Sequence, residues 1–536
     1  MPGRAWLGYF RPHPGSETPW WFRLFIAAIS GAALSFSYTG FYLSIYSWVC
    51  IAVLLIAIFG TTPRVAFFCG YVHAIFFVFT SVPWIAEVLA VHGGLPRAGG
   101  WGVLLLIASV WGVGNGGVTW AIQRLSRRSI TLACVAAPFF WIDLEMFRTW
   151  LPEVSFPWNL LGYPAAGNVA LVQLTSVTGI YGLSFVVAGF NALLAWSDAE
   201  TKQPPARRLA ILLGAAATIL VVMLVGPHFV PMPVSEHTAR GVQLNFPEVD
   251  EFPSDWFETH QADLEEIQRF SLAPSAHHPD LLVWPETPAP FSYQDLRFAR
   301  LATDLAVKFQ NPFIAGVVEW KPETVTSGGA SHTIMAPYNS ALMIDARGRR
   351  AFSYDKVHLV PFGEYEPFPL IHRVVSNVSS EVGGFRKGTS YTVGKFANGY
   401  SFAVFICYEA IYPGEVRRFA ANGAQVFVNI SNDGWFGHSA AAEQHLRMAR
   451  VRAAENRRWL VRTTNSGVTV SVDPYGRIFR PLPPDVRAAA DLPYDFRTDK
   501  TIYTRFGDWF AWLCLIVSAM LLIVYWKPKE MNEATK

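Results

Sequence analysis

Eight long runs of apolar residues constrain this chain more than any other feature, because about 20 such residues are needed to cross about 30 Å of lipid hydrocarbon. Apolar side chains make up 52% of the 536 residues. Seven runs precede a long polar block and one follows it. They lie near 22–38, 41–60, 65–85, 101–123, 130–147, 175–196, 208–226 and 508–526. The sequence therefore predicts a polytopic α-helical membrane protein with about eight spans. No removable signal peptide is expected, since a second run follows the first directly.

Lysine and arginine in the short loops predict the orientation, because they concentrate on the cytoplasmic side of a membrane. With seven spans before the polar block, every basic cluster falls on one side. These residues are Arg4, Arg11, Arg23, Arg64, Arg124, Arg127, Arg128, Lys202, Arg207, Arg208, Lys527 and Lys529. The other side carries little beyond Arg97 and Arg148. We therefore expect both termini in the cytoplasm and the polar block outside. A net charge of +3 gives no reason to expect nucleic acid as a partner.

The polar block reads as an α/β domain inserted between membrane segments. The predicted domains are 1–231, with about seven membrane helices; 232–500, the soluble domain; and 501–536, a final transmembrane helix and tail. Strands are expected at 241–246, 281–286, 313–320, 339–345, 401–407, 424–431, 459–465 and 467–473, and helices at 256–270, 293–309 and 442–456. Continuous apolar strands alternating with helices favour sheets covered by helices, with reactive residues at strand ends.

Cys407 is the one cysteine outside the apolar runs, which contain Cys50, Cys69, Cys134 and Cys514. A single thiol on the oxidising side of a membrane cannot form an internal disulfide, so its presence needs a reason. It ends the apolar run "SFAVFIC" (401–407). A packed core cysteine is the structural alternative to a nucleophile.

Two further polar residues stand at comparable strand ends. Glu286 ends "LLVWPE" and Lys356 follows "RRAFSYD". A carboxylate can take the proton of the Cys407 thiol, and an ammonium can stabilise the thiolate and the oxyanion formed when it attacks a carbonyl. This combination favours acyl transfer through a thioester. Alternatively, Glu286 is a helix cap and Lys356 a solvated loop residue.

Four motifs carry a resemblance to a known family. "WPET" (284–287), "YDKVHLVPFGEYEP" (354–367), "CYEAIYP" (407–413) and "NDGWFG" (432–437) resemble the carbon–nitrogen hydrolase (nitrilase) superfamily. "EQHLRMARVRAAENRRWLVRTTNSGVTVSVDPYG" (443–476), "FPWNLLGY" (156–163) and "GIYGLSFVVAGFNALL" (179–194), with seven spans before and one after, look specifically like the apolipoprotein N-acyltransferases of the bacterial inner membrane. The resemblance implies an α-β-β-α sandwich for the soluble domain, located in the periplasm.

The resemblance also implies residue roles. Cys407 would be the nucleophile, Glu286 the general base and Lys356 the stabiliser of the tetrahedral intermediate. The supporting or substrate-binding residues would be Glu364, Trp256, Asn339, Tyr408 and Glu409. The segment "GHSAAAE" departs from the family, which commonly has a Gly-Pro pair near that point. We expect a local loop difference there.

The implied reaction has two steps. Cys407 would take an acyl group from a phospholipid such as phosphatidylethanolamine, and the α-amino group of a diacylglyceryl-cysteine on an apolipoprotein would then accept it. The protein would act as a monomer. One alternative is a membrane-tethered amidase or nitrilase that hydrolyses a small amide. The other is a transporter or lipid-binding scaffold in which the three strand-end residues are accidental.

Two groups of residues remain open on sequence alone. Asp143, Glu145 and Arg148 follow an apolar run, where charged residues are either functional or reach toward the membrane interface. No cluster of cysteine and histidine has metal-ligand spacing, and His277 and His278 look like a loop pair. We therefore expect no metal and no organic cofactor.

Overall fold

The computed structural model describes residues 18–93, 95–151, 155–249, 252–327, 330–361, 363–365 and 384–525. Of the basic residues that predict the orientation, Arg4, Arg11, Lys527 and Lys529 lie outside these ranges. The chain divides into two compact units. The first contains Met1–Pro83, Trp101–Val230 and Asp508–Lys536, and the second contains Trp84–Gly100 and Pro231–Gly507.

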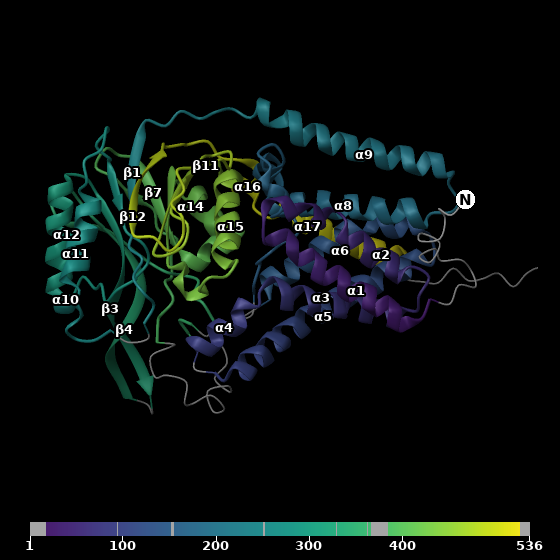
Figure 1. Cartoon of the computed structure of the whole chain (residues 1–536), viewed down its shortest axis with the longest axis horizontal. Coiled ribbons are helices and arrows are strands. Elements are labelled where there is room, and N and C mark those ends of the chain that lie inside the picture. Colours follow the sequence, from purple (N-terminus) through teal and green to yellow (C-terminus); the bar gives the residue numbers. More distant parts are fainter. Residues whose placement is uncertain are drawn as a thin grey trace, which may run out of the picture. The chain divides into compact units, whose positions relative to one another are not determined.

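The first unit is helical (Figure 1). Its longer helices are α1 (Trp20–Ser35), α2 (Cys50–Ile58), α3 (Pro63–Ser81), α5 (Arg97–Ser126), α6 (Ile130–Trp150), α8 (Ile180–Ala199), α9 (Pro205–Val225) and α17 (Trp509–Tyr525). Short helical segments are η2 (Phe36–Tyr38), η3 (Phe41–Trp48), η4 (Ala165–Gly167), η5 (Leu171–Leu174), α7 (Thr175–Thr178) and η6 (Gly226–Phe229). Each of the eight apolar runs contains a helix. In the described part of the chain, six apolar helices are long enough to cross a membrane, and Leu43–Ile58 and Trp509–Tyr525 are shorter.

Glu145 and Arg148 support an irregular segment between α6 and α8. Trp158 and Leu161 of this segment are buried although they belong to no regular helix. The Leu161 N–H donates to Glu145 Oε1 at 2.7 Å, and the Arg148 guanidinium donates to the Trp158 carbonyl. Irregular backbone among apolar helices has to find its partners inside the protein. Both charged side chains are therefore built into the interior, while Asp143 is half-buried.

The second unit contains two six-stranded sheets. The first has the order β12-β1-β2-β3-β4-β5 and the second the order β11-β10-β9-β8-β7-β6. The strands are β1 (His237–Gln243), β2 (Leu281–Val283), β3 (Phe313–Ser327), β4 (Ala330–Ile344), β5 (Arg350–Asp355), β6 (Gly394–Lys395), β7 (Ser401–Ile406), β8 (Val426–Ser431), β9 (Trp459–Thr464), β10 (Val470–Val472), β11 (Ile478–Phe479) and β12 (Ala488–Tyr494). Strands β1 to β3 run parallel, as do β7 to β9, with Ile406 opposite Ile430.

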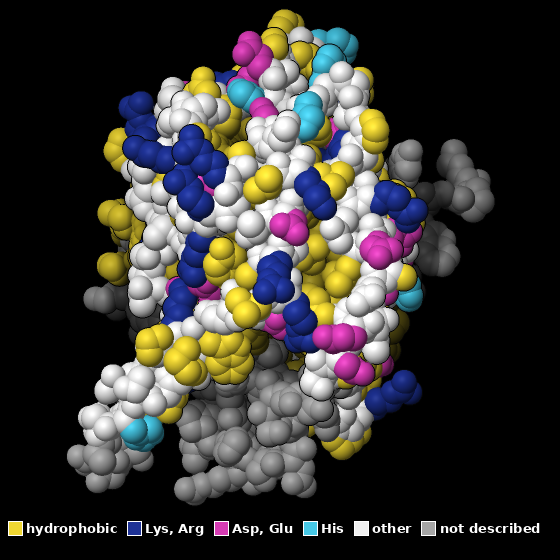
Figure 2. Space-filling view, turned by 90° about the vertical axis from the view of Figure 1, so that its left-hand side faces the viewer, with side chains coloured by type: hydrophobic (Ala, Val, Ile, Leu, Met, Phe, Trp, Pro, Cys, Tyr) yellow, Lys and Arg dark blue, Asp and Glu magenta, His cyan; other side chains and the backbone are white. Residues whose placement is uncertain are grey.

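Helices cover the outer face of each sheet, so the unit is an α-β-β-α sandwich (Figure 1). Helices α10 (Trp256–Thr259), α11 (Gln261–Ser271) and α12 (Leu296–Phe309) pack on the first sheet. Helices α14 (Pro413–Ala421) and α15 (Ala441–Asn456) pack on the second. The exterior on the side of α11 and α12 mixes basic, acidic and apolar side chains (Figure 2). The predicted fold class, a helical membrane protein with an inserted nitrilase-like sandwich, is confirmed.

Burial on both faces explains the sequence of β7. Phe402 through Ile406 are all fully buried, because one face of the strand packs on the first sheet and the other on α14 and α15. Such a strand reads as a continuous apolar run rather than as an alternating one. Strand β7 ends at the carboxyl edge of the second sheet. Cys407 follows it directly and begins the short helix η7 (Cys407–Ile411).

One helix from the loop between apolar runs belongs to the second unit. Helix α4 (Trp84–Val91) follows Pro83 and packs on η8 (Asp433–Phe436). The Trp84 and Phe436 rings meet edge to face with their centroids 4.8 Å apart, and those of His92 and Trp435 are 4.7 Å apart.

Residues 65–85 were expected to form one continuous span, but α3 ends at Ser81. Another short helix, α16 (Ile502–Phe506), closes the unit.

Candidate active site

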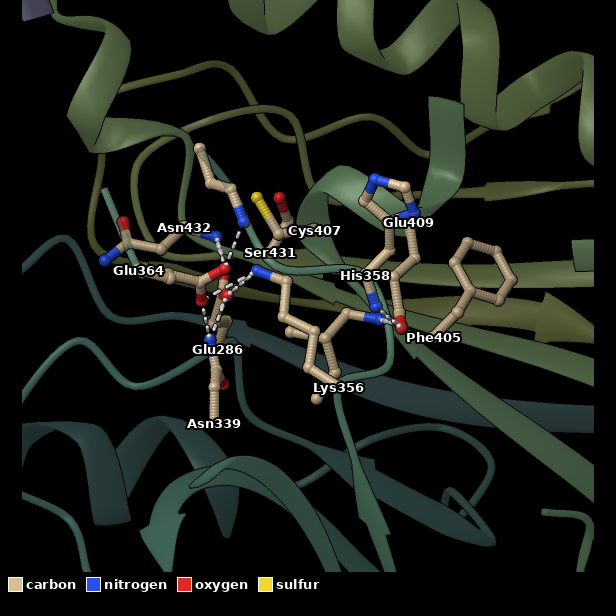
Figure 3. Close-up of polar contacts among 12 residues, drawn as sticks. Glu286, Asn339, Lys356, His358, Glu364, Phe405, Cys407, Glu409, Ser431 and Asn432 are labelled. Carbon is tan, nitrogen blue, oxygen red and sulfur yellow. Dashed lines mark hydrogen bonds and ion pairs between the residues drawn. The ribbon is translucent and has the colours of Figure 1, made fainter. Parts of the chain in front are cut away.

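Residues that follow strands of both sheets meet at one buried cluster (Figure 3). Glu286 lies three residues beyond β2, Lys356 directly follows β5, and Cys407 directly follows β7. Lys356 Nζ donates to Glu286 Oε1 at 3.0 Å. Electrostatic interactions join Cys407 to both of these residues. All three side chains are buried, so the sequence-predicted acid, lysine and thiol lie in one water-poor site.

Glu286 is held in place by three donors. Besides Lys356, the Asn339 side-chain amide donates to Oε1 at 2.7 Å, and the Asn432 N–H donates to Oε2 at 2.9 Å. A group surrounded only by donors is arranged as an ionised carboxylate, which accepts hydrogen bonds and donates none. Gly316 makes this packing possible, because a Cβ there would lie 2.6 Å from the Glu286 Cα.

Glu364 is a second carboxylate of the cluster. Its Oε1 accepts from Lys356 Nζ at 3.0 Å and from the Asn339 amide at 2.6 Å, and its Oε2 accepts from the Val360 N–H at 2.7 Å. One ammonium and one amide therefore each join the two carboxylates Glu286 and Glu364. This arrangement fixes the direction of all four side chains.

The charge of Lys356 is secured by these two carboxylates. Burial lowers the pKa of its ammonium, but the negative charges of Glu286 and Glu364 outweigh burial and hold the pKa above its ordinary value. Lys356 is therefore cationic at neutral pH. Together with the two carboxylates it leaves the cluster with one net negative charge.

Cys407 rests as a thiol. Burial raises the pKa of its sulfur, the negative charge of Glu286 raises it further, and Lys356 only partly opposes these effects. A thiolate would add a second negative charge to the cluster. Transfer of the thiol proton to Glu286 avoids this, because it leaves the total charge of the cluster unchanged. Proton transfer and nucleophilic attack are thus suited to occur together.

The backbone at Cys407 is strained. Its φ angle is +46°, in the left-handed region that non-glycine residues rarely adopt. Such conformations persist where the surrounding structure enforces them. Here Glu409 Oε2 accepts from the Ile406 N–H at 2.7 Å, and His445 Nε2 lies 3.0 Å from the Cys407 carbonyl oxygen. The tight turn places the sulfur at the end of β7.

A second buried network lies behind Cys407. Asp433 bonds His445 Nδ1 at 2.9 Å and accepts from Arg462 at 2.7 Å. Burial disfavours the Asp433 carboxylate, but Arg462 and His445 outweigh burial and hold its pKa below its ordinary value. Sequence reasoning did not single out these three residues. All three lie in the family-like motifs 432–437 and 443–476, which were the available signal.

The Asp433 and His445 groups of this network that could bind a metal already have protein partners. Cys407, Asp433 and His445 each offer a ligand atom within 4.8 Å of the others. However, both Asp433 oxygens and both His445 nitrogens already contact protein groups. The Arg462 guanidinium also places a positive charge where a cation would sit. The residues therefore fit a hydrogen-bonded support better than a metal site.

The other predicted site residues have different places. Glu409 accepts from the Tyr354 hydroxyl at 2.6 Å and from the Val357 N–H at 2.7 Å, and thus ties the end of β5 to the end of β7. Tyr408 is buried, with its ring 5.7 Å from that of His358. Trp256 stacks on His260 at 4.5 Å inside the aromatic core that packs on the first sheet. Asn339 thus contacts Glu286 and Glu364 contacts Lys356, whereas the structure places Trp256 in a packed core.

Residues 239–491 match the family model of the carbon–nitrogen hydrolases. A solved member of the nitrilase superfamily from Saccharomyces cerevisiae is 19% identical, covers 48% of this chain and 90% of its own, and has a TM-score of 0.35. The family model, which matches residues 239–491, identifies this part of the second unit as a carbon–nitrogen hydrolase domain.

Residues 30–193 match the apolipoprotein N-acyltransferase N-terminal domain. Apolipoprotein N-acyltransferase of Geobacter metallireducens is 30% identical over 518 residues, which are 95% of this chain and 96% of that relative. The relative from Allorhizobium ampelinum is 29% identical over 486 residues, 86% of this chain and 88% of its own. The chain belongs to the apolipoprotein N-acyltransferase family. It is an acyltransferase, and its apolar helices and its family point to the inner membrane.

Proposed function

We propose that this protein transfers an acyl group from a phospholipid to the N-terminal amine of a diacylglyceryl-cysteine on an apolipoprotein, through a thioester on Cys407. The observation that carries the proposal is the joining of Glu286, Lys356 and Cys407 in one buried cluster of a chain with a helical membrane unit. The names of the relatives support the acceptor class.

In the first step, Glu286 takes the thiol proton and the Cys407 sulfur attacks the ester carbonyl carbon of the phospholipid, for which phosphatidylethanolamine is the proposed donor. The ammonium of Lys356 stabilises the oxyanion of the tetrahedral intermediate. The carbon–oxygen bond then breaks, and Glu286 returns the proton to the departing lysophospholipid oxygen. The product is an acyl thioester on Cys407.

In the second step, the acceptor amine attacks the thioester carbonyl. Glu286 takes a proton from the amine nitrogen, the carbon–sulfur bond breaks, and the sulfur regains a proton as the amide forms. Water would compete with the amine at this stage. The burial of Glu286, Lys356 and Cys407 supports exclusion of bulk water from the thioester.

The proposed topology follows the basic loop residues. Residues 1–231 form the membrane domain, 232–500 the periplasmic catalytic domain, and 501–536 the last transmembrane helix and cytoplasmic tail. The protein works as a monomer, with both termini in the cytoplasm. The catalytic residues are Glu286, Lys356 and Cys407, supported by Glu364 and Asn339, with Tyr408, Glu409 and Trp256 in supporting positions.

Mass spectrometry of the purified protein incubated with phospholipid tests the proposal. We expect an adduct of one acyl chain on Cys407, which disappears when a diacylglyceryl-cysteine peptide is added and reappears as an amide on that peptide. Cys407→Ser should remain folded and membrane-inserted but accumulate no acyl-enzyme. An adduct on another residue, or retention of the adduct by Cys407→Ser, would overturn the assignment.

The same experiment separates the two rivals. An amidase would release ammonia and free acid from a small amide and leave the peptide amine unmodified. A transporter or lipid-binding scaffold would form no adduct, and Glu286→Gln would leave its lipid binding intact. Transfer of labelled acyl chains to the peptide amine distinguishes the proposed enzyme from both.

A further inference from the structure

The helical unit contains a small cavity lined by apolar and polar side chains. Its volume is about 30 Å³, and its lining residues come from α1, η2, α3, α5, α6 and the irregular segment after α6. Apolar side chains form most of the wall. The polar lining residues that matter here are His73, Asn115, Glu145, Arg148 and Asn159.

Each of these five residues is more than nine-tenths buried. Glu145 and His73 are 1% exposed, and Arg148 is 8% exposed. Within the described residues, each also has one polar atom without a hydrogen-bond partner. These atoms are His73 Nε2, Asn115 Oδ1, Glu145 Oε2, Arg148 Nε and Asn159 Nδ2.

Other polar atoms of the same side chains already have protein partners. Glu145 Oε1 holds the Leu161 N–H, Arg148 holds the Trp158 carbonyl, and the Asn115 amide lies 3.1 Å from His73 Nδ1. A buried polar atom left without a partner costs about 1–3 kcal/mol, and more when the group is charged. Five such atoms around one cavity are too many for a dry space.

The chemistry of the wall identifies the occupant. Arg148 Nε and Asn159 Nδ2 are donors, whereas Glu145 Oε2 and Asn115 Oδ1 are acceptors. An anion would face the Glu145 carboxylate, and a cation would face the Arg148 guanidinium. A lipid headgroup is too large for about 30 Å³. Water offers two donors and two acceptors, and a cavity needs about 10–15 Å³ for each molecule.

We propose that this cavity is an internal water site that holds one or two ordered waters. The waters complete the hydrogen bonding of Glu145 and Arg148, which in turn hold the irregular backbone around Trp158 and Leu161. The site thus gives Glu145 and Arg148 of α6 a structural role.

X-ray radiolytic footprinting of the purified full-length protein in oxygen-18 water tests this site, because ordered internal waters generate hydroxyl radicals beside their neighbours. Trp111 and Trp141 line the cavity and are 4% and 8% exposed, while Trp48 is 6% exposed and lies elsewhere in the same unit. We expect both cavity tryptophans to be labelled about tenfold faster than Trp48, since an ordered water lies within contact distance. Equal rates for the three residues would show a dry cavity and overturn the proposal.

A pair of substitutions identifies the source of the label. Ala74→Val adds two methyl groups to the cavity wall, whereas Ala136→Val adds the same volume to a buried position outside that wall. Ala74→Val should lower labelling of Trp111 and Trp141 to the rate of Trp48, and Ala136→Val should leave it high. Fast labelling that persists in folded Ala74→Val would contradict the site. If either variant fails to fold, the three wild-type rates decide the question.

Discussion

At the scale of single residues, the cluster depends on carboxylates that share donors. Lys356 and Asn339 each contact both Glu286 and Glu364. A change in one carboxylate therefore reaches the other through the shared ammonium and amide. Substitution of Glu364 leaves Glu286, Lys356 and Cys407 in place. It therefore tests this coupling more directly than substitution of those three residues does.

Glu364→Gln should slow thioester formation about 10- to 100-fold, because a hydrogen bond to a charged group contributes about 1.5–3 kcal/mol. The wild-type Glu364 carboxylate accepts three hydrogen bonds. Glutamine replaces one of its two acceptor oxygens with an amide donor. Single-turnover acylation by labelled phospholipid measures the effect. Glu443→Gln, which removes an exposed partner of Arg447, is the matched control and should be near wild type. Equal rates for both variants would show that Glu364 has no part in the chemistry.

Glu248 predicts a pH dependence near neutrality. Burial raises the pKa of its carboxyl from 4.5 to about 7, and Glu286 adds to the increase. Because this folded-state pKa lies above the ordinary value, the contribution of Glu248 to the free energy of unfolding falls as pH rises from about 4.5 through about 7. The ionised form also places a second negative charge near Glu286, which favours movement of the thiol proton into the cluster. Thioester formation, in which no amine acts as the nucleophile, should therefore become faster as pH rises through 7.

The control for this prediction is Glu248→Gln, which cannot ionise. The side chain accepts from the Asn432 and Asn465 amides at 3.0 Å, and glutamine keeps one acceptor for them. The rise in single-turnover rate near pH 7 should flatten in the variant. An unchanged profile would assign the titration to another group.

The residue scale was also where the sequence was most informative. Cys407, Glu286 and Lys356 could be proposed because each ends a recognisable apolar or strand-like run. Their meeting could not be derived, since β2 and β5 belong to one sheet and β7 to the other. Asp433, His445 and Arg462 meet from η8, α15 and β9, and no local pattern marks such a contact.

At the scale of elements, strands with a strong apolar pattern were predicted well. The expected strands at 401–407 and 459–465 correspond to β7 and β9. Strand β1 begins at His237 and ends at Gln243, earlier than the expected 241–246. Strand β12 was not expected, because "AAADLPY" has few β-favouring residues and contains proline. Its pairing with β1 is a long-range contact that local sequence does not encode.

We expect helix α4 to stabilise η8 of the second unit. It packs Trp84 on Phe436 of η8, the element that carries Asp433. An aromatic pair contributes about 0.5–1.5 kcal/mol beyond its buried area, so its loss should loosen η8. Trp84→Ala should increase amide hydrogen exchange at 433–436 several-fold while leaving β8 protected. Unchanged exchange at 433–436 would show that α4 does not support this loop.

At the scale of the whole molecule, the proposed orientation is the property most open to test. Ser254 and Thr201 are both exposed, in the second and first unit respectively. In a background whose natural cysteines are replaced, Ser254→Cys should react with an impermeant maleimide from the periplasmic side. Thr201→Cys should react only after the inner membrane is opened. The reverse pattern would place the catalytic domain in the cytoplasm.

The places of the apolar helices could be predicted from composition, whereas the interior of the helical unit could not. Hydropathy locates the runs because hydrocarbon selects apolar residues at every lipid-facing position. The roles of Glu145 and Arg148 depend on the irregular backbone folded against them. Only the three-dimensional contacts distinguish such buried supports from side chains that extend to the interface.

Helix α9 stands apart from the rest of its unit. None of its residues from Pro205 to Val225 is buried against protein. The Met223 carbonyl accepts from Asn168 and Arg208 donates to the Ser197 carbonyl, but no side chain of the helix has to fit a packed core, so many different apolar sequences are compatible with it. This helix is the natural place to graft an unrelated membrane anchor, a fluorescent reporter or a purification handle without redesigning the enzyme.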